Sequence, residues 1–284
     1  MATFFNRATL NLGASSLNSN VTTGEVQAAL SLTKTAVSEN YGTGDGITYI
    51  LSLVNSGAAD VTGVVLTDDL GAYSLDGGTT TLVPLDYVDG SVLYYSNGVL
   101  QAPPAVAVGE TLTFSGITVP ADGGVTIIYE TRANAFAPLS AGSAINNTVS
   151  TVSCPEALTS SASVPVREET ALSLAKAVCP GTVSCGDELT YTFVIQNTGN
   201  VAVAVTDNLN VTDTFSPSLS NLTVSLNGTA LEEGTGYTYN ETTGEFATLP
   251  GAIPVSAATY SRDPQTGAVT VNPGFAVLTV SGTV

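Results

Sequence analysis

Hydrophobic and polar residues alternate along much of this chain with a period of two, rather than the period of 3.6 that a helix requires. The alternation places large apolar side chains on one face of each segment and smaller polar ones on the other. The clearest examples are Ile47, Tyr49, Leu51 and Leu53, and later Leu189, Tyr191, Phe193 and Ile195. Each of these segments is therefore predicted to be a strand with one buried face.

Turn signals separate the predicted strands. Asn-Gly pairs occur at Asn97-Gly98 and Asn227-Gly228, and both residue types accept the positive φ of a tight hairpin. Short strands between closely spaced turns, without helical periodicity, indicate an all-β fold. We expect antiparallel β-sandwiches of the immunoglobulin-like type.

The pattern of the first half of the chain recurs in the second half, which is the strongest signal in the sequence. Matching segments are 29–34 with 171–176, 47–57 with 189–199, 66–70 with 211–215, 92–98 with 222–228, and 112–116 with 278–282. We therefore expect two tandem sandwich repeats, residues 29–168 and 169–284. An N-terminal strand or hairpin segment, residues 1–28, precedes them.

The matched segments resemble the bacterial and archaeal surface repeats known as "domain of unknown function eleven". The resemblance covers about residues 28–284 and depends on four short motifs: Leu32–Lys34, Thr48–Gly57, Leu66–Asp68 and Asn146–Val149. It implies a sandwich module used as a stalk or fibre segment, and it implies no activity.

The second repeat ends earlier than the first. Repeat one continues beyond residues 112–116 through candidate strands at 125–131 and 145–152, whereas only Thr283 and Val284 follow residues 278–282. By this alignment repeat two lacks one or two closing strands, which would leave apolar core and a strand edge uncovered. A rival alignment pairs residues 251–260 with 116–129. The ungapped match of 112–116 with 278–282 favours the first alignment.

The N-terminal segment has the pattern of the strand that repeat two lacks. One face of it carries Phe4, Asn6, Ala8, Leu10 and Leu12, in the way that one face of the closing strand of repeat one carries Ile145, Asn147 and Val149. We expect donation of this strand to repeat two of another copy, and such a head-to-tail contact propagates into a filament. The alternative is that residues 1–28 fold back on repeat one as a hairpin or form a flexible tail.

Three inward positions of repeat one carry polar residues: Lys34, Asp68 and Asn147. A lone buried charge is unfavourable, so we expect these side chains to meet. Surface adhesins and pilins of similar architecture often join such a Lys and Asn by an isopeptide bond. That reaction needs a neutral amine and a protonated acid, and apolar burial favours both. The alternatives are a Lys34–Asp68 ion pair hydrogen-bonded to Asn147, and a different register in which Lys34 extends to solvent.

Repeat two carries two members of the same set. Lys176 and Asp213 occupy inward positions, and no asparagine downstream of them matches Asn147. We expect Asn6 of a neighbouring subunit to occupy the third place. A covalent bond there would cross-link the fibre at each joint.

Composition excludes several classes of partner. The formal net charge of −18 comes from 24 acidic residues against six Lys and Arg, and such a surface repels nucleic acid and anionic lipid. No apolar run approaches the roughly 20 residues of a membrane helix, so we expect no membrane insertion. No acidic run has calcium ligands at alternate positions, and we expect neither a metal nor a cofactor.

Enzymatic activity is not expected. The chain contains no histidine, so arrangements that pair Ser, Cys or a metal with His are excluded. No glycine-rich phosphate loop is present either.

Of the three cysteines, Cys179 and Cys185 are candidates for a small disulfide loop, which leaves Cys154 unpaired or intermolecular; three reduced thiols are the alternative. The N-terminus lacks the charged leader and apolar core of a secretory signal. We nevertheless expect an extracellular location, or one at a cell or spore surface.

These observations favour a structural subunit of a self-assembling extracellular fibre or appendage, with other copies of itself as its partner. The alternative is a monomeric surface module for adhesion or carbohydrate binding. Such a module would use exposed aromatic groups such as Tyr94 and Tyr95.

Overall fold

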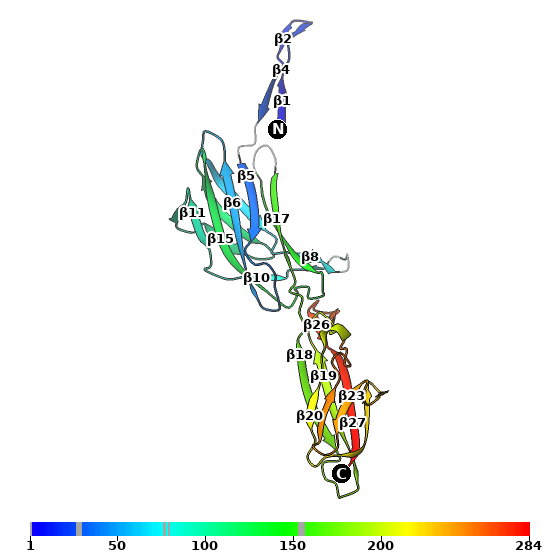
Figure 1. Cartoon of the computed structure of the whole chain (residues 1–284). Coiled ribbons are helices and arrows are strands. Elements are labelled where there is room, and N and C mark those ends of the chain that lie inside the picture. The colour runs from blue at the N-terminus through cyan, green and yellow to red at the C-terminus, as the bar shows by residue number, and fades with distance from the viewer. Residues whose placement is uncertain (1, 27–29, 76–77, 79, 153–156) are drawn as a thin grey trace. The chain divides into compact units, whose positions relative to one another are not determined.

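The computed structural model describes every residue of the chain except 1, 27–29, 76–77, 79 and 153–156. The chain forms two compact units (Figure 1): unit 1 comprises residues 1–138 and 144–166, and unit 2 comprises residues 139–143 and 167–284. No α-helix occurs among the described residues; a 3-10 turn, η2, spans Val205–Asp207. The prediction of an all-β sandwich fold is confirmed.

The first sheet of unit 1 has the strand order β12-β11-β15-β6-β5, and β10 also pairs with β15. Its strands are β5 (Leu30–Ala36), β6 (Gly46–Asn55), β10 (Leu85–Tyr87), β11 (Leu93–Ser96), β12 (Val99–Gln101) and β15 (Gly123–Ala133). The predicted inward residues of β6 are fully buried: Ile47, Tyr49, Leu51 and Leu53. The alternation therefore identified the core face of this strand correctly.

The second sheet of unit 1 has the order β13-β14-β7-β16-β17. Its strands are β7 (Val61–Asp68), β13 (Ala105–Val108), β14 (Leu112–Val119), β16 (Ala144–Val152) and β17 (Ala157–Pro165), and a short hairpin of β8 (Tyr73–Ser74) and β9 (Thr81–Leu82) lies outside it. Strand β17 packs along β5 of the first sheet, where the Lys34 N–H donates to Ser160 Oγ at 2.8 Å. The β16–β17 hairpin thus closes the sandwich.

Unit 2 has one sheet of order β18-β19-β27-β21-β22 and a second of order β20-β24-β23. The first contains β18 (Leu172–Cys179), β19 (Glu188–Asn197), β21 (Ser220–Leu226), β22 (Thr229–Leu231) and β27 (Gly274–Thr283). The second contains β20 (Thr212–Thr214), β23 (Tyr237–Asn240) and β24 (Glu245–Thr248), and β25 (Thr259–Arg262) pairs separately with β26 (Val269–Asn272). Phe193, Phe215 and Phe246 lie in the core between the two main sheets.

The two units share one strand order. Strands β18, β19, β27, β21 and β22 correspond to β5, β6, β15, β11 and β12, and strands β20, β24 and β23 correspond to β7, β14 and β13. In the described part of unit 2, no strand corresponds to β16 or β17. Two strands of the unit 1 order therefore have no counterpart.

Both sequence alignments of the last strand are wrong in detail. Residues 278–282 belong to β27, which corresponds to β15, whereas residues 112–116 belong to β14, whose counterpart is β24. The rival alignment also fails, because residues 251–258 form an irregular segment with a single bridge at Val255, and residues 259–260 belong to β25 and not to a counterpart of β15. A five-residue alternating match has little specificity in an all-β chain, because every half-buried strand alternates in the same way.

Strands β5 and β18 show what the two unmatched strands change. Inward residues Leu30, Leu32 and Lys34 of β5 are buried, and Leu32 is 9% exposed. Every residue of β18 is exposed, and Leu174, at the position of Leu32, is 59% exposed. The same inward pattern thus lies against β17 in unit 1 and against solvent in unit 2.

The N-terminal residues form a two-part hairpin. Strand β1 (Ala2–Asn6) pairs with β4 (Thr22–Val26), and β2 (Thr9–Leu12) pairs with β3 (Ser15–Asn18). The predicted strand from Phe4 to Leu12 is therefore interrupted between Asn6 and Thr9. Phe4 lies opposite Gly24, and its ring covers the glycine so closely that an added Cβ would lie 2.3 Å from it.

The matched leucines give a direct test of burial. We expect Leu32→Ala to lower the free energy of unfolding of unit 1 by about 2–5 kcal/mol, because it leaves a cavity in a packed core. Leu174→Ala should change that of unit 2 in the monomer by no more than about 0.5 kcal/mol, because the side chain is already in water. Urea denaturation of each variant measures both values. Equal losses would show that β18 is as well covered as β5.

Candidate functional site

The first candidate site is an ion pair between the two sheets of unit 1. Lys34 comes from β5 in one sheet and Asp68 from the end of β7 in the other. Lys34 Nζ lies 2.5 Å from Asp68 Oδ2, and both side chains are completely buried. Sequence parity predicted that both would point inward, and the structure brings them together.

Tyr129 on β15 and Tyr49 on β6 complete the surroundings of this pair. The Tyr129 hydroxyl donates a hydrogen bond to Asp68 Oδ2, and the Leu70 N–H donates to Asp68 Oδ1 at 3.0 Å. Lys34 Nζ lies 4.7 Å from the centroid of the Tyr49 ring and 5.9 Å from that of Tyr129. The carboxylate is therefore held by three donors, and the amine lies against two aromatic faces.

Neither tyrosine was singled out from the sequence as a site residue. Tyr49 was placed in the core as one of four inward residues of its strand, where a tyrosine has the same pattern as a phenylalanine. The one available signal was that two inward tyrosines lie in the strand pair next to an inward lysine. A buried tyrosine hydroxyl needs a polar partner.

Asn147 on β16 is fully buried beside the same tyrosines. It lies close enough to both hydroxyls to oppose, in part, the rise in the pKa of Tyr49 and Tyr129 that burial causes. Yet neither its Oδ1 nor its Nδ2 completes a well-aligned hydrogen bond, and the Tyr49 hydroxyl also has none. An amide left in this state is unusual, because unpaired buried polar atoms cost about 1–3 kcal/mol each.

The charge state of Lys34 follows from its burial. Removal from water lowers the pKa of the amine to about 8, although the attraction of Asp68 acts in the opposite direction. A lysine in water has a pKa of 10.5. At neutral pH a larger fraction of Lys34 is therefore in the neutral, nucleophilic form than of an exposed lysine.

Lysine, aspartate and asparagine are the side chains that an amide exchange would use. The neutral Nζ of Lys34 would attack Cγ of Asn147, the Cγ–Nδ2 bond would break, and the proton released by the amine would leave with Nδ2 as ammonia. Asp68 is placed to relay that proton, since its Oδ2 contacts both the amine and the Tyr129 hydroxyl. The product would be an amide that joins β5 to β16.

The second candidate site is the corresponding pair in unit 2. Lys176 Nζ donates to Asp213 Oδ2, and Nζ lies 4.5 Å from the ring centroid of Tyr191 and 5.5 Å from that of Phe215. The side chains are 39% and 18% exposed, whereas those of the first pair are at 0%. The same pair is thus formed in both units but is buried in only one.

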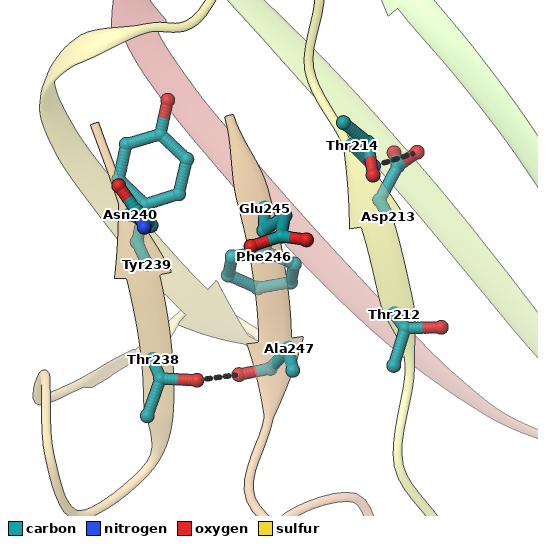
Figure 2. A pocket seen from close by; sticks show the side chains of 9 residues that line it. All are labelled: Thr212, Asp213, Thr214, Thr238, Tyr239, Asn240, Glu245, Phe246 and Ala247. Atoms are coloured by element: carbon teal, nitrogen blue, oxygen red, sulfur yellow. Dashed lines mark hydrogen bonds between the residues drawn. The ribbon is translucent and has the colours of Figure 1, made fainter. Parts of the chain in front are cut away.

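Asp213 also borders a hollow of about 390 Å³ along β20, β24 and β23 (Figure 2). Tyr239, Glu245 and Phe246 are among its lining residues. The Thr238 hydroxyl donates a hydrogen bond to the Ala247 carbonyl of the neighbouring strand (Figure 2). In unit 1 the strand that corresponds to β20, β7, pairs with β16 through Asp68 and Val149. In the described part of unit 2, β20 pairs with β24 alone.

The predicted polymerisation strand is exposed in the single chain. Phe4 is 55% exposed, and Leu10 and Leu12 are exposed as well, so the hairpin leaves its apolar side chains in water. Asn6 and Ala8 are also exposed. The chain folds these residues into a hairpin with its own partner strands, and no side chain of β2 or β3 is buried.

The cysteines do not form the candidate disulfide in this structure. Cys179 and Cys185 are both free and exposed. Cys154 lies outside the described residues.

Metal clusters and membrane-spanning helices are both absent from the described residues. No cluster of three or more His, Cys, Asp or Glu side chains there is arranged to hold a metal ion. No helix in that part of the chain has the length and apolar character needed to cross a membrane.

Comparison with known proteins gives structural likenesses only. No protein-family model and no curated protein matches the chain. A solved chain named BspA_C_mut superposes with a TM-score of 0.33 and 13% identity, over 89% of this chain and 90% of that one. The pilus backbone RrgB of Streptococcus pneumoniae gives 0.35 and 12%, over 87% of this chain and 55% of that one. BcpA, the major pilin subunit of Bacillus cereus, gives 0.35 and 12%, over 96% and 73%. Likenesses at this level identify no family and carry no conclusion about function.

The lowered pKa of Lys34 predicts a pH dependence in a chain that cannot form the amide, such as Asn147→Ala. Between pH 8 and 10 the unfolded chain keeps the lysine proton and the folded chain has lost it, so the free energy of unfolding should rise with pH. At about 1.4 kcal/mol per pH unit, the gain is about 2 kcal/mol. Above pH 10 the raised pKa values of Tyr49 and Tyr129 act in the opposite direction.

Urea titrations across that pH range measure the slope. Adding Lys34→Met to the Asn147→Ala chain should abolish it, and the chain with Asn147 in place should lack it if Lys34 is already acylated. A slope that survives Lys34→Met would assign the effect to another group.

Proposed function

We propose that this chain is the structural subunit of an extracellular, self-assembling fibre, in which the N-terminal segment of one copy completes unit 2 of the next. The observation that carries the proposal is the inward face of β18. Leu172, Leu174 and Val178 are exposed there, whereas the equivalent face of β5 is covered by β17. A sandwich with an open apolar face and an open strand edge is a docking surface for a strand.

The pattern of the N-terminal segment supports this assignment. With Asn6 at the position of Asn147, Phe4 takes the position of Ile145 and Ala8 that of Val149. The apolar members of this strand would therefore face the core of unit 2. Asn6 would lie beside Lys176 and Asp213, where unit 1 has its buried amide.

Docking would bury apolar side chains of both the N-terminal segment and β18, which favours association. Burying Phe4, Leu10 and Leu12 contributes roughly 1.5–3 kcal/mol each, and the exposed leucines of β18 add similar amounts. Ordering a free tail would cost about 1–2 kcal/mol per residue. Strands β1 and β2 are already paired in the single chain, so much of that ordering precedes assembly.

We also propose that lysine–asparagine amides stabilise the fibre. Lys34 and Asn147 would form one within unit 1, and Lys176 would form a second with Asn6 of the neighbouring copy, each with loss of one ammonia. The resemblance to surface repeats supports a role outside the cell, and such bonds would suit a structural polymer rather than a catalyst. The net charge of −18 argues against nucleic acid as a partner.

The bond within unit 1 has a simple signature in the intact mass. We expect the chain to be lighter than its sequence by one ammonia, because the Cγ–Nδ2 bond of Asn147 is lost. Asn147→Ala and Asp68→Asn should each show the mass calculated from their own sequences. An unaltered chain at its full calculated mass would refute this bond and leave the ion pair.

Assembly is tested with a matched pair of phenylalanines. Phe4 faces the proposed docking surface, Phe5 faces away from it, and both are exposed in the single chain. Phe4→Ser should weaken polymerisation about 10-fold to 100-fold, corresponding to the loss of roughly 1.5–3 kcal/mol of burial, and Phe5→Ser should leave it nearly unchanged. Electron microscopy and sedimentation at a series of concentrations measure both.

Removal of residues 1–12 should abolish filaments completely. Filaments that persist without these residues would contradict strand donation. A chain that stays monomeric at every concentration would favour the adhesion module instead.

The covalent joint has its own test. If Lys176 and Asn6 of two copies are linked, boiling in detergent should leave a ladder of multimers. Asn6→Ala should collapse the ladder to single chains, while Asn11→Ala, on the opposite face of the strand, should retain it. Filaments that dissociate completely in detergent would show that the joint is non-covalent.

A further inference from the structure

Two strands, β16 and β17, close the sandwich of unit 1, so unit 2 needs two added strands to be closed in the same way. Strand β16 pairs with β7, and β17 pairs with β16 and packs along β5. A single donated strand would therefore take the place of β16 beside β20. It would leave the exposed face of β18, the counterpart of β5, still uncovered.

We infer that the whole N-terminal hairpin, and not one strand of it, inserts into unit 2 of a second copy. Strand β1 would take the place of β16, and β4 the place of β17. This inference rests on the proposed function, since it specifies what is transferred at the same joint. The occupant is a segment of this chain that already exists as a hairpin with its apolar side chains in water.

The pairs of β1 with β4 can be superposed on the first pairs of β16 with β17. Asn147 lies opposite Ala162 in unit 1, and Asn6 lies opposite Thr22 in the N-terminal hairpin. When these two pairs are superposed, the pair formed by Ile145 and Val164 corresponds to Phe4 and Gly24. Both hairpins therefore present an asparagine and a large apolar residue from the first strand.

The Phe4–Gly24 pair fills the place of two buried aliphatic side chains. Ile145 and Val164 are both buried in unit 1. In the N-terminal hairpin one ring covers the glycine opposite it, so that a Cβ at Gly24 would meet three ring atoms within 2.9 Å. The ring of Phe4 thus fills the space beside Gly24, whereas in unit 1 the corresponding space is shared by the side chains of Ile145 and Val164.

A serine also lies near this point in both hairpins, although the register of the N-terminal hairpin shifts by one residue between its β1–β4 and β2–β3 parts. Ser160 lies opposite Val149 and accepts a hydrogen bond from the Lys34 N–H. Ser19 lies opposite Ala8: its N–H donates to the Ala8 carbonyl, and its Oγ accepts from the Ala8 N–H. The N-terminal hairpin therefore carries a hydroxyl next to the residue that corresponds to Val149.

Transfer of the intact hairpin also keeps its own hydrogen bonds. Donation of β1 alone would separate it from β4 along five paired positions, from Ala2 and Val26 to Asn6 and Thr22. Insertion of both strands breaks none of these pairs. It covers β20 and β18 in one step.

Neighbouring threonines on β4 separate the two kinds of donation. Thr22 corresponds to Ala162, which faces inward, and Thr23 faces the opposite side; both are exposed in the single chain. In the full-length chain, Thr22→Arg should reduce polymerisation at least tenfold, because it would place a second cation beside Lys176 in a desolvated joint. Thr23→Arg should polymerise like the unaltered chain. Equal polymerisation of both variants would overturn hairpin insertion and leave donation of a single strand.

Hydrogen exchange of the unaltered polymer provides a second readout that needs no variant. Insertion of the hairpin should slow exchange at residues 22–24 relative to the single chain, because β4 becomes an inner strand. Donation of β1 alone should speed exchange there, because β4 loses its partner, and that result would refute the inference. If the unaltered chain forms no polymer, or if removal of residues 1–12 has no effect on it, the proposed function itself fails and this inference fails with it.

Discussion

The buried ion pair between Lys34 and Asp68 constrains the arrangement of the strands of unit 1. Two opposite charges lie between two sheets, where each would be unfavourable without the other. The amine comes from β5, the carboxylate from β7 and a hydroxyl donor from β15. Since a slip of one residue turns every side chain of a strand to the other face, the pair ties together the registers of these strands.

Unit 2 shows which part of the fold makes that pair a buried one. Lys176 and Asp213 contact each other on equivalent strands and beside equivalent aromatic rings, yet both stay accessible to water. The difference lies in the two strands that cover β5 and β7 in unit 1. Burial, and with it the lowered pKa of Lys34, is thus a consequence of closure by β16 and β17 rather than of the pair itself.

Much of this arrangement is visible in the sequence, because parity is a strict rule in a half-buried strand. It predicted the core face of β6 and the inward direction of Lys34, Asp68 and Asn147, and the Asn-Gly turns are present with positive φ at Asn97 and Asn227. Parity does not reveal which strands are neighbours. The strand β27 was therefore matched to the wrong partner, and the hydroxyl of Tyr129 was not recognised as a donor to Asp68.

The N-terminal segment was the hardest to predict for a related reason. Its alternation indicated a strand, but short strands rich in Ser, Thr and Asn specify their partner and register weakly. The pairing of Phe4 with Gly24 depends on the absence of a side chain, which a hydrophobic pattern does not register. A hairpin was one of the predicted alternatives for residues 1–28, and the partners and register of its strands emerged only from the structure.

The neighbouring positions of β5 and β17 have a mechanical consequence for a fibre built in the proposed way. The chain enters the sandwich of unit 1 at the start of β5 and leaves it at the end of β17, and the bridge between Tyr41 and Val166, which follows both strands, is parallel. A pull on the two ends would therefore load these strands lengthwise in opposite directions. In this shear geometry the contacts between β5 and β17 would bear the load simultaneously and would not break one after another.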